Sequence, residues 1–261
     1  MAVWVRFERG GSTALGRVEG GVVQVHEGDL FAGARPTGET VPLEGLALAT
    51  PVEPSKYIGL VNNLRAAAER QGGAIPAEPL YFLKAPSAFL APGRAIRLPA
   101  GDVGKVIYEG ELGVVIGRVA RDVAEADADR FIFGYTCVND VTALDLLGRD
   151  PTFAQWTRAK SFDTFGPFGP VIATGLEPDR LTVRTLVNGK VRQEYPCSDL
   201  IFSPRALVSR ISRELTLLPG DLIACGTSLG IGVLRRGATV DVAIEGIGTL
   251  SNPVEGAAEA G

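Results

Sequence analysis

The stretch of sequence that decides the fold runs from Lys105 to Gly117 and reads Lys-Val-Ile-Tyr-Glu-Gly-Glu-Leu-Gly-Val-Val-Ile-Gly. Its β-branched and apolar residues predict a strand deep in a sheet. Glu109 and Glu111 stand two residues apart in it, and side chains at i and i+2 of a strand leave from the same face. Two carboxylates are therefore expected to converge in otherwise apolar surroundings.

Such a pair of carboxylates repels itself and resists desolvation, so it needs protonation, cationic partners or a bound metal ion to persist. A hard divalent cation is the natural resolution. The alternative is an edge strand whose two glutamates face water. Asp140 is a third acidic residue of interest, because it ends the strand predicted over residues 131–140, and sites are commonly assembled at strand ends.

The composition is that of an ordinary globular protein. The 261 residues are 46% hydrophobic and 21% charged, and the net charge is −4. This slight acidity offers no basic footprint for nucleic acid and no polybasic membrane patch. No apolar run reaches transmembrane length, and the start lacks the layout of a secretion signal. We therefore expect a cytoplasmic protein that binds neither nucleic acid nor membranes.

The cysteines and the histidine limit which catalytic and metal-binding sites the chain can form. Three cysteines, Cys137, Cys197 and Cys225, are far apart and odd in number, which argues against a disulfide framework and predicts buried thiols. The only histidine, His26, lies near the N-terminus in a pattern typical of an outward strand position. A histidine-rich zinc site is therefore excluded, and a Ser-His-Asp triad would have to recruit His26.

Many glycines and prolines punctuate short apolar runs, which predicts a β-rich fold with many turns and few long helices. Residues 1–54 are interpreted as a small N-terminal β domain and its Pro-bearing linker, and residues 55–261 as the main domain. Hairpin turns are expected at Glu19-Gly20-Gly21 and at Asn188-Gly189. Further strands are expected at residues 4–7, 14–18, 22–25, 57–60, 80–84, 183–187, 191–195, 222–225, 239–244 and 248–250.

Helix signals are fewer. Asn62 as N-cap, an alanine-rich middle and a glycine stop predict a short helix over residues 62–73, and Ser203 followed by Pro204 opens a helix to about residue 215. Helical segments are also expected at residues 124–130, 142–148 and 151–160. A stiff loop is expected at residues 166–170, and a frayed polar tail after Val254.

Several ordered blocks between residues 57 and 253 resemble the fumarylacetoacetate hydrolase superfamily. They are Phe82-Leu-Lys84 with Pro86-Ser87, Tyr108-Glu-Gly-Glu111-Leu with Val115-Ile-Gly117, Gly134-Tyr135 with Asn139-Asp140-Val-Thr142, Gln155-Trp with Arg158-Ala-Lys160-Ser-Phe-Asp163, Gly169-Pro170, Val187-Asn-Gly189 with Gln193, and Leu218-Pro-Gly-Asp221 with Gly226-Thr227. Chance agreement in that order is very improbable.

The resemblance implies a β-rich α+β fold, a mixed β-sandwich roll with a smaller N-terminal β domain, usually assembled as a homodimer. It also implies Mg²⁺ or Mn²⁺ held by three carboxylates, which match Glu109, Glu111 and Asp140. This agrees with the reading of the residues, since all-oxygen ligands with open positions suit a hard cation.

Members of the superfamily act on 2-oxo or 1,3-dicarbonyl acids, whose enolate a cation stabilises. Lys160 matches the lysine of the family site, as a partner for that oxyanion, and Lys84 could support the acidic cluster or the substrate carboxylate. Thr227 matches a substrate-contacting threonine. Gly226 would let a backbone N–H approach an anion, and Gln155 belongs to a matching block as a further substrate-binding candidate.

The resemblance fails on the short helix near the start of the main domain. Hydrolytic members carry Asn-Tyr-x-x-His-x-x-Glu there, and the His/Glu pair activates water. Here Glu69 fits the glutamate, but Ala66 stands in place of the histidine. Loss of a general base typically costs about 10²–10⁴-fold in rate. Glu69 could act alone with a pKa raised by burial, metal-bound water could attack directly, or the reaction could need no water.

A second departure follows Asp140. Many members place Arg and Gln where Leu144 and Leu147 stand. Loss of a guanidinium removes a bidentate carboxylate clamp, which predicts a less charged or bulkier distal end of the substrate. Asp145 is retained, and we interpret it as a structural hydrogen-bond acceptor.

Three functions remain open. The first is a metal-dependent hydrolase that cleaves a C–C bond in an acylpyruvate-like or β-diketo acid, as in catabolism of aromatic rings. The second is an isomerase or decarboxylase that acts on a hydroxy-dienedioate or 2-oxo acid without activating water. The third is a dimer that binds metal and an oxo acid without turnover.

Overall fold

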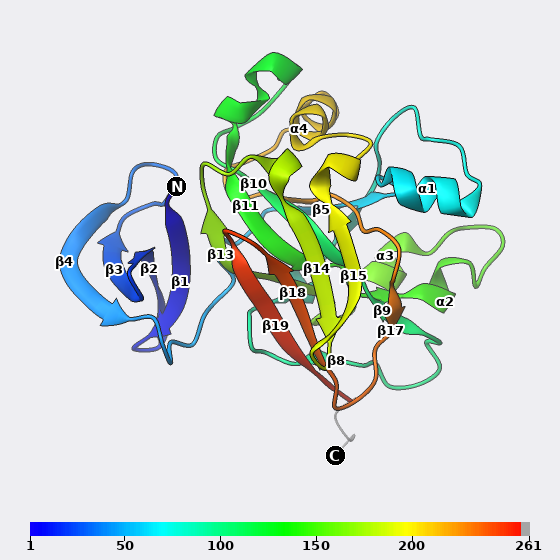
Figure 1. Ribbon diagram of the computed structural model, residues 1–261, viewed down its shortest axis with the longest axis horizontal. Coiled ribbons are helices and arrows are strands. Elements are labelled where there is room, and N and C mark those ends of the chain that lie inside the picture. The colour runs from blue at the N-terminus through cyan, green and yellow to red at the C-terminus, as the bar shows by residue number, and fades with distance from the viewer. Residues whose placement is uncertain (257–261) are drawn as a thin grey trace.

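In the computed structural model, which describes residues 1–256, four N-terminal strands form an antiparallel meander. Figure 1 shows this small β domain as a lobe at the left of the molecule. The predicted turn at Gly20 and Gly21 joins its second and third strands, whereas its long polar fourth strand was missed because it lacks alternation of apolar residues. The strands are β1 (Val3–Arg9), β2 (Ser12–Glu19), β3 (Val22–Glu27) and β4 (Arg35–Pro42).

The lobe continues into the large mixed sheet of the main domain, because Val3 and Trp4 of β1 pair with the edge of that sheet. The sheet has 11 strands in the order β4-β3-β2-β1-β13-β11-β10-β16-β5-β6, with β7 beside β13. The predicted division of the chain at residues 54 and 55 stays a prediction. The main-domain strands are β13 (Gly166–Ala173), β11 (Ile132–Asn139), β10 (Gly110–Ile116), β16 (Leu222–Ala224), β5 (Tyr57–Val61), β6 (Leu80–Lys84) and β7 (Phe89–Leu90).

A second sheet packs against the first, and the main core lies between them. Strands β10, β11 and β13 contact β14, β18 and β19, and the side chains of Leu112, Val183 and Val242 are buried in this layer. The predicted Asn188-Gly189 turn joins β14 and β15. The order is β15 (Lys190–Pro196), β14 (Thr182–Val187), β18 (Thr239–Ile244), β19 (Gly248–Glu255) and β8 (Ile96–Arg97).

The predicted strand over residues 105–117 is broken at Glu109. The first part, β9 (Val106–Tyr108), joins β12 (Thr142–Ala143) and β17 (Gly232–Val233) in a three-stranded sheet, while β10 continues in the large sheet. Two hydrogen bonds fix the break: Asn139 Oδ1 accepts from Glu109 N at 3.0 Å, and Asp140 N donates to Glu109 O at 2.8 Å. The deciding stretch thus passes from one sheet to another at the first glutamate.

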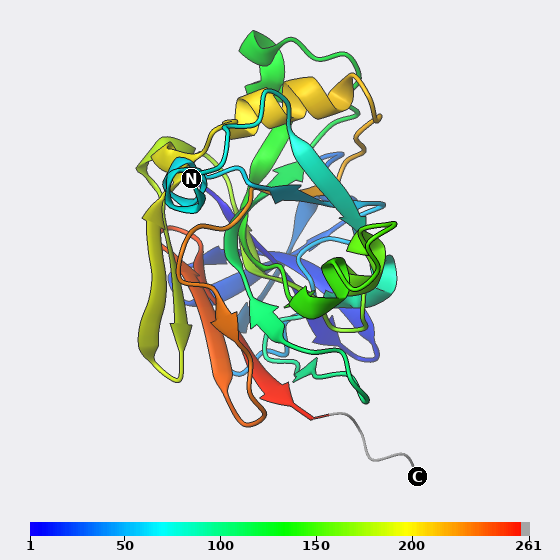
Figure 2. The same cartoon turned by 90° about the vertical axis from the view of Figure 1, so that its right-hand side faces the viewer.

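The helices are short, as expected, although several bounds differ from the prediction. They are α1 (Arg65–Gln71), α2 (Leu144–Leu147), α3 (Trp156–Lys160) and α4 (Pro204–Ser212), and Figure 2 shows α4 lying across the top of the molecule. Ser203 Oγ caps α4 by accepting from Ala206 N at 3.2 Å, as the sequence predicts. Residues Glu125–Arg130 form a 3₁₀-helix, as do Pro86–Ala88, Pro178–Arg180 and Cys197–Asp199.

One predicted helix cap and one predicted loop are wrong. Helix α1 begins at Arg65 with Leu64 at its N-cap, whereas the predicted cap, Asn62, stands outside the helix with a φ of +54°. The next residue, Asn63, is buried, and its side chain binds the main chain of Phe202 and Cys225. Residues 166–170, predicted as a loop, begin strand β13, since β11 and β7 pair with it on either side.

Strand β19 extends to Glu255, beyond its expected end. The rest of the predicted tail, residues 257–261, lies outside the described residues.

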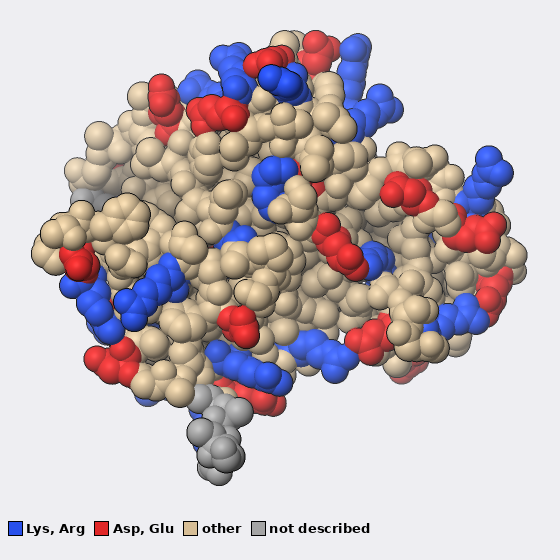
Figure 3. Space-filling view, turned by 180° about the vertical axis from the view of Figure 1, so that it is seen from behind, with Lys and Arg blue, Asp and Glu red and all other residues tan. Residues whose placement is uncertain are grey.

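Figure 3 shows the face opposite that of Figure 1, where acidic and basic side chains are interspersed over a largely uncharged surface. No helix between residues 1 and 256 is long and apolar enough to cross a bilayer.

Candidate metal and substrate site

Three carboxylates meet where β9, β10 and β11 end or begin. Glu109 occupies the break between β9 and β10, Glu111 is the second residue of β10, and Asp140 follows the last residue of β11. The pairing of Gly110 with Asn139 brings these strand ends together. One oxygen atom from each carboxylate lies within 4.8 Å of the others. The predicted convergence of acidic side chains is thus present, although the strand that carries it is broken.

Burial makes this acidic cluster costly. It raises the pKa of Glu109, and it raises the pKa of Glu111 well above its ordinary value, with the charges of Asp140 and Glu109 adding to the effect. For Asp140 burial also acts to raise the pKa, but the ammonium groups of Lys160 and Lys84 lower it below its usual value. The negative charge of Asp140 is therefore stabilised by the two lysines, whereas burial disfavours the charged forms of Glu109 and Glu111.

Lys160 bridges two members of the cluster from the end of α3. Its Nζ lies 2.6 Å from Glu109 Oε2 and 2.6 Å from Asp140 Oδ2, and it sits 4.6 Å from the centre of the Phe82 ring. Burial acts to lower the pKa of Lys160, but the carboxylates of Asp140 and Glu109 raise it above its ordinary value. Lys160 is therefore held as a cation at the edge of the acidic cluster.

Lys84, by contrast, points into the protein. Its Nζ donates to the main-chain oxygens of Val141, Lys160 and Phe165 at 2.9, 2.7 and 2.7 Å, and it lies 2.7 Å from Asp140 Oδ1. Burial lowers the pKa of Lys84 to about 8. Because its donors are engaged inside the protein, Lys84 anchors Asp140 and the end of α3. The predicted contact with substrate stays a prediction that these contacts do not favour.

The predicted Gly226 and Thr227 close the opposite side. Gly226 N donates to Glu111 Oε2 at 2.7 Å, so this N–H orients a carboxylate of the protein. Thr227 Oγ1 donates to Gly110 O at 3.0 Å and accepts from Gln193 Nε2 at 2.9 Å. Gln193 also accepts from Gly110 N through Oε1 at 3.0 Å. Its role was missed, although its alternation with the buried Tyr195 on β15 marked it as inward-facing.

A cavity of about 200 Å³ opens onto this cluster. Trp156, whose indole stacks on Phe82 at 5.6 Å between ring centroids, forms part of its apolar wall and was not singled out from the sequence. The cavity is lined by Glu109, Glu111, Lys160 and Thr227 together with Leu60, Val61, Asn62, Ala67, Leu147, Trp156, Ser228, Leu229, Gly230 and Ile231.

Besides Asp140, Lys84 and Gly226, two further predicted site residues do not line the cavity. Gln155 is the residue next to Trp156, and its side chain lies 3.5 Å from Phe153 O. Glu69 is exposed on α1, so it is not the buried base that the sequence left open. The neighbouring Ala67 is the residue through which α1 contributes to the cavity wall.

The donor set fits a hard divalent cation. Glu111 Oε1 is buried and has no hydrogen-bond partner among the described residues. An unpaired carboxylate oxygen in that position carries a desolvation cost that a cation would remove. Together with Glu109 and Asp140, it supplies the oxygen ligands that Mg²⁺ and Mn²⁺ prefer.

Comparison with known proteins identifies the family and the fold. Residues 56–255 match the fumarylacetoacetate (FAA) hydrolase C-terminal family, and residues 4–51 match the Rv2993c-like N-terminal family. The chain belongs to the fumarylacetoacetate hydrolase superfamily. The resemblance drawn from the ordered motifs is confirmed, and so is the β-rich fold with a small N-terminal β domain.

Members of the superfamily with different activities are similar to this chain. The oxaloacetate tautomerase YisK of Bacillus subtilis (strain 168) is 39% identical over 226 residues, which cover 81% of this chain and 74% of the relative. The crystal structure of 2-hydroxyhepta-2,4-diene-1,7-dioate isomerase from Mycobacterium marinum is 40% identical, with a TM-score of 0.90 over 98% of this chain and 99% of that one.

A hydrolase of the superfamily is less similar. The maleylpyruvate hydrolase from Sphingobium sp. SYK-6, in complex with manganese (II) ion and pyruvate, is 27% identical, with a TM-score of 0.79 over 99% of this chain and 100% of that one. The chain is therefore a superfamily enzyme with an acidic metal-binding triad.

Proposed function

We propose that the protein is a divalent-metal-dependent isomerase that interconverts the keto and enol forms of a small 2-oxo acid. The observation that carries this proposal is the set of titratable groups around the cavity. Among the described residues that line it, these are Glu109, Glu111 and Lys160. All three belong to the acidic cluster or are paired with it, so no separate base faces the cavity to activate water.

The histidine of the chain supports the same conclusion. His26 lies on β3 in the N-terminal domain, where its ring packs edge-on against Trp4 at 4.9 Å and its Nδ1 lies 2.8 Å from Gln24 O. It does not line the cavity, and Ala66 stands where the resemblance to hydrolytic members predicts a histidine. A reaction that consumes no water is consistent with both facts.

The comparisons also favour isomerisation over the hydrolase that the sequence placed first. The relatives that are named as a tautomerase and an isomerase are 39% and 40% identical to this chain, whereas two proteins that are named as hydrolases, from Exiguobacterium antarcticum and Sphingobium sp. SYK-6, are 32% and 27% identical. Among the functions left open by the sequence, the isomerase is the better supported.

The residues have distinct tasks in this proposal. Glu109, Glu111 and Asp140 would hold Mg²⁺ or Mn²⁺, which supplies Lewis-acid stabilisation of negative charge on the oxygen of a 2-oxo acid. Lys160 remains protonated and donates a hydrogen bond toward the same developing charge.

Gln193 donates a hydrogen bond to Thr227 and so fixes one side of the cavity, and Trp156 contributes to its apolar wall. The reaction relocates one proton between carbon and oxygen, so its atoms balance without a co-reactant.

Product analysis tests this function. We would incubate Mg²⁺-loaded protein with oxaloacetate, hydroxy-dienedioates and acylpyruvates and identify the products by mass. We expect products with the mass of the substrate. Two fragments that carry one solvent oxygen would identify a hydrolase, and release of CO₂ would identify a decarboxylase. Binding without conversion of any compound would identify a non-catalytic protein.

A further inference from the structure

One buried amide side chain, that of Gln193, lies between the stretch that carries the two glutamates and the wall of the reaction cavity. Gln193 is on β15, is almost fully buried and does not itself line the cavity. Its Oε1 accepts from Gly110 N at 3.0 Å, while its Nε2 donates to Thr227 Oγ1 at 2.9 Å and to Ser228 O at 3.1 Å. The amide thus joins the residue between the two glutamates to the segment over residues 226–231, here called the cavity loop.

The edge of β10 explains why Gly110 binds side chains. Strand β16 pairs with β10 at residues 113–115 and does not reach Gly110. The carbonyl of Gly110 accepts instead from Tyr195 Oη at 2.8 Å and from Thr227 Oγ1 at 3.0 Å, and its N–H donates to Gln193. Buried main-chain groups without a partner carry a desolvation cost, so these three side chains replace the missing strand.

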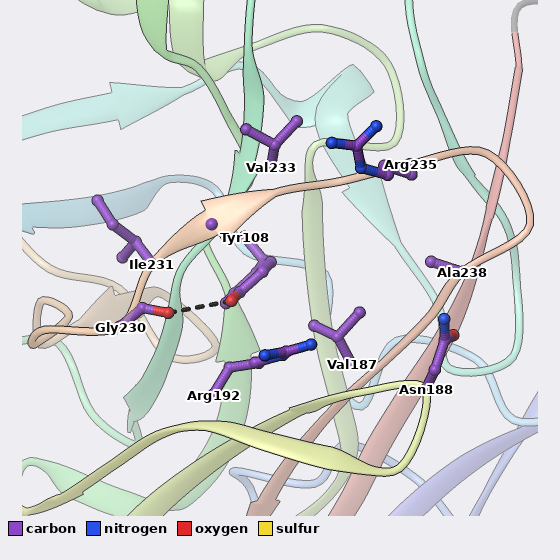
Figure 4. A pocket seen from close by; sticks show the side chains of 10 residues that line it. Tyr108, Val187, Asn188, Arg192, Gly230, Ile231, Val233, Arg235 and Ala238 are labelled. Atoms are coloured by element: carbon purple, nitrogen blue, oxygen red, sulfur yellow. Dashed lines mark hydrogen bonds between the residues drawn. The ribbon is translucent and has the colours of Figure 1, made fainter.

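The same stretch also holds both ends of the cavity loop. At the start of the loop, Gly226 N donates to Glu111 Oε2 at 2.7 Å. Near its end, the hydroxyl of Tyr108 donates to Gly230 O at 3.0 Å (Figure 4). A shift of the loop would therefore break hydrogen bonds to residues that directly precede or form part of the acidic triad.

The main chain of β15 supports the cavity loop as well. Gly230 has a φ of +93°, and a Cβ added there would lie 2.2 Å from the main-chain oxygen of Arg192, so the loop lies directly on the β15 backbone. Side chains alternate along this strand. Gln193 is buried, whereas the next residue, Glu194, is exposed and pairs with Arg184 at 3.0 Å. The contact with the acidic cluster thus belongs to position 193 and not to position 194.

We propose that Gln193 is a positioning residue that couples the metal ligands to the cavity loop. Its Oε1 holds Gly110, and with it the glutamates on either side, in the geometry that binds the metal ion. Its Nε2 holds Thr227 and Ser228, which line the cavity, at a fixed place beside that ion. The inference rests on the proposed function for the identity of the ligand, a small 2-oxo acid, and deepens it.

Two variants of Gln193 test the coupling. Gln193→Met has a similar length and removes both hydrogen-bonding groups. Gln193→Asn keeps a polar amide in the buried site, but it is one methylene too short to bind Gly110 and Thr227 together. Glu194→Gln, on the adjacent exposed position, is the control. Calorimetric titration with Mg²⁺ alone, and then with 2-oxobutanoate at saturating Mg²⁺, measures the two affinities independently of turnover.

We expect both Gln193 variants to bind Mg²⁺ about tenfold more weakly, the lower end of the range for loss of a group that orients a metal ligand. Binding of 2-oxobutanoate should weaken by about fivefold, because the cavity loop loses a buried hydrogen-bond donor. Glu194→Gln should match the wild type. A lower melting temperature with both affinities unchanged would show a purely structural role and overturn the inference, and so would a loss confined to one of the two affinities.

A double-mutant cycle with Thr227→Val tests the contact itself. Thr227→Val alone should weaken binding of 2-oxobutanoate by about fivefold, but by less than about twofold in the Gln193→Met background, where its hydrogen bond to Gln193 is already absent. Losses that multiply independently would overturn the coupling.

These titrations also separate the inference from the proposed function. A protein whose two affinities depend on Gln193, but which shows no tautomerase activity, contradicts the proposed function while supporting the role of Gln193. A tautomerase whose Gln193→Met variant keeps both affinities overturns the role of Gln193 alone.

Discussion

The ammonium nitrogen of Lys160 lies 2.6 Å from Oδ2 of Asp140, inside the cluster of carboxylates. Lys160 is almost fully buried, and it touches a second carboxylate at Glu109. A lysine in this position offsets part of the charge of the triad and still faces the cavity. It can therefore stabilise negative charge on a substrate without acting as a metal ligand.

Replacing Lys160 should separate catalysis from metal binding. We expect Lys160→Met to lower kcat by about 10²–10³-fold, the range for loss of one donor to a developing oxyanion. Metal affinity should be kept or increased, because the carboxylates lose a competing cation. Steady-state kinetics and calorimetry with Mg²⁺ measure the two effects, and Lys105→Met, at an exposed lysine, serves as the control. Equal activity in Lys160→Met would contradict the role.

The acidic residues should differ in how much they contribute to Mg²⁺ binding. We expect Glu111→Gln to weaken Mg²⁺ binding by at least about tenfold, because it removes a charged ligand whose Oε1 lacks another partner. Asp145→Asn should leave the affinity unchanged, since Asp145 is exposed and accepts from Lys105 N at 2.9 Å. Calorimetric titration of both variants checks this. A comparable loss of affinity in Asp145→Asn would show that Asp145 is a further metal ligand.

Glu69 should be dispensable. It is exposed on α1 and does not line the cavity, so Glu69→Gln is expected to keep kcat within about twofold of the wild type. The assay is the keto–enol conversion used for the wild type. A loss of a hundredfold with metal still bound would instead identify Glu69 as the general base.

The buried thiols predict a loss of stability at alkaline pH. Burial raises the pKa of Cys137 to about 12, whereas the unfolded thiol titrates near its ordinary value of about 8.5. The stabilisation is therefore complete below the unfolded pKa and is lost as the pH rises toward 12, because the unfolded state releases its proton first. Relative to Cys137→Ala, the wild type should lose about 1–2 kcal/mol of unfolding free energy between pH 8 and pH 10.

Urea unfolding at the two pH values measures this difference. The comparison with the variant cancels the contributions of other groups that titrate in the same range. A difference between wild type and variant that does not depend on pH would show that the thiol ionises equally in both states.

The sequence predicts most of the acidic triad but not the break in the strand that carries the two glutamates. The spacing of Glu109 and Glu111 predicted that their carboxylates converge, and the family resemblance added Asp140, which stands at a strand end, as the third member of the cluster. The break at Glu109 could not be predicted, because the apolar pattern runs through it unchanged and the break depends on Asn139, thirty residues later. Local periodicity carries no information about a partner of that kind.

The different environments of Lys84 and Lys160 could not be predicted from the sequence either. Lys84 and Lys160 both match family motifs, yet one donates to three buried carbonyls and the other faces the cavity. Those carbonyls belong to residues 141, 160 and 165, which only the folded chain brings together.

The most direct test of the account is the conversion of enol oxaloacetate to its keto form by Mg²⁺-loaded protein, compared with Glu109→Ala under the same metal concentration. The account predicts conversion at least about a hundredfold faster with the wild type than with the variant, with the carbon skeleton recovered intact by mass spectrometry. Equal rates for the two proteins, or cleavage into fragments that carry a solvent oxygen, would contradict it.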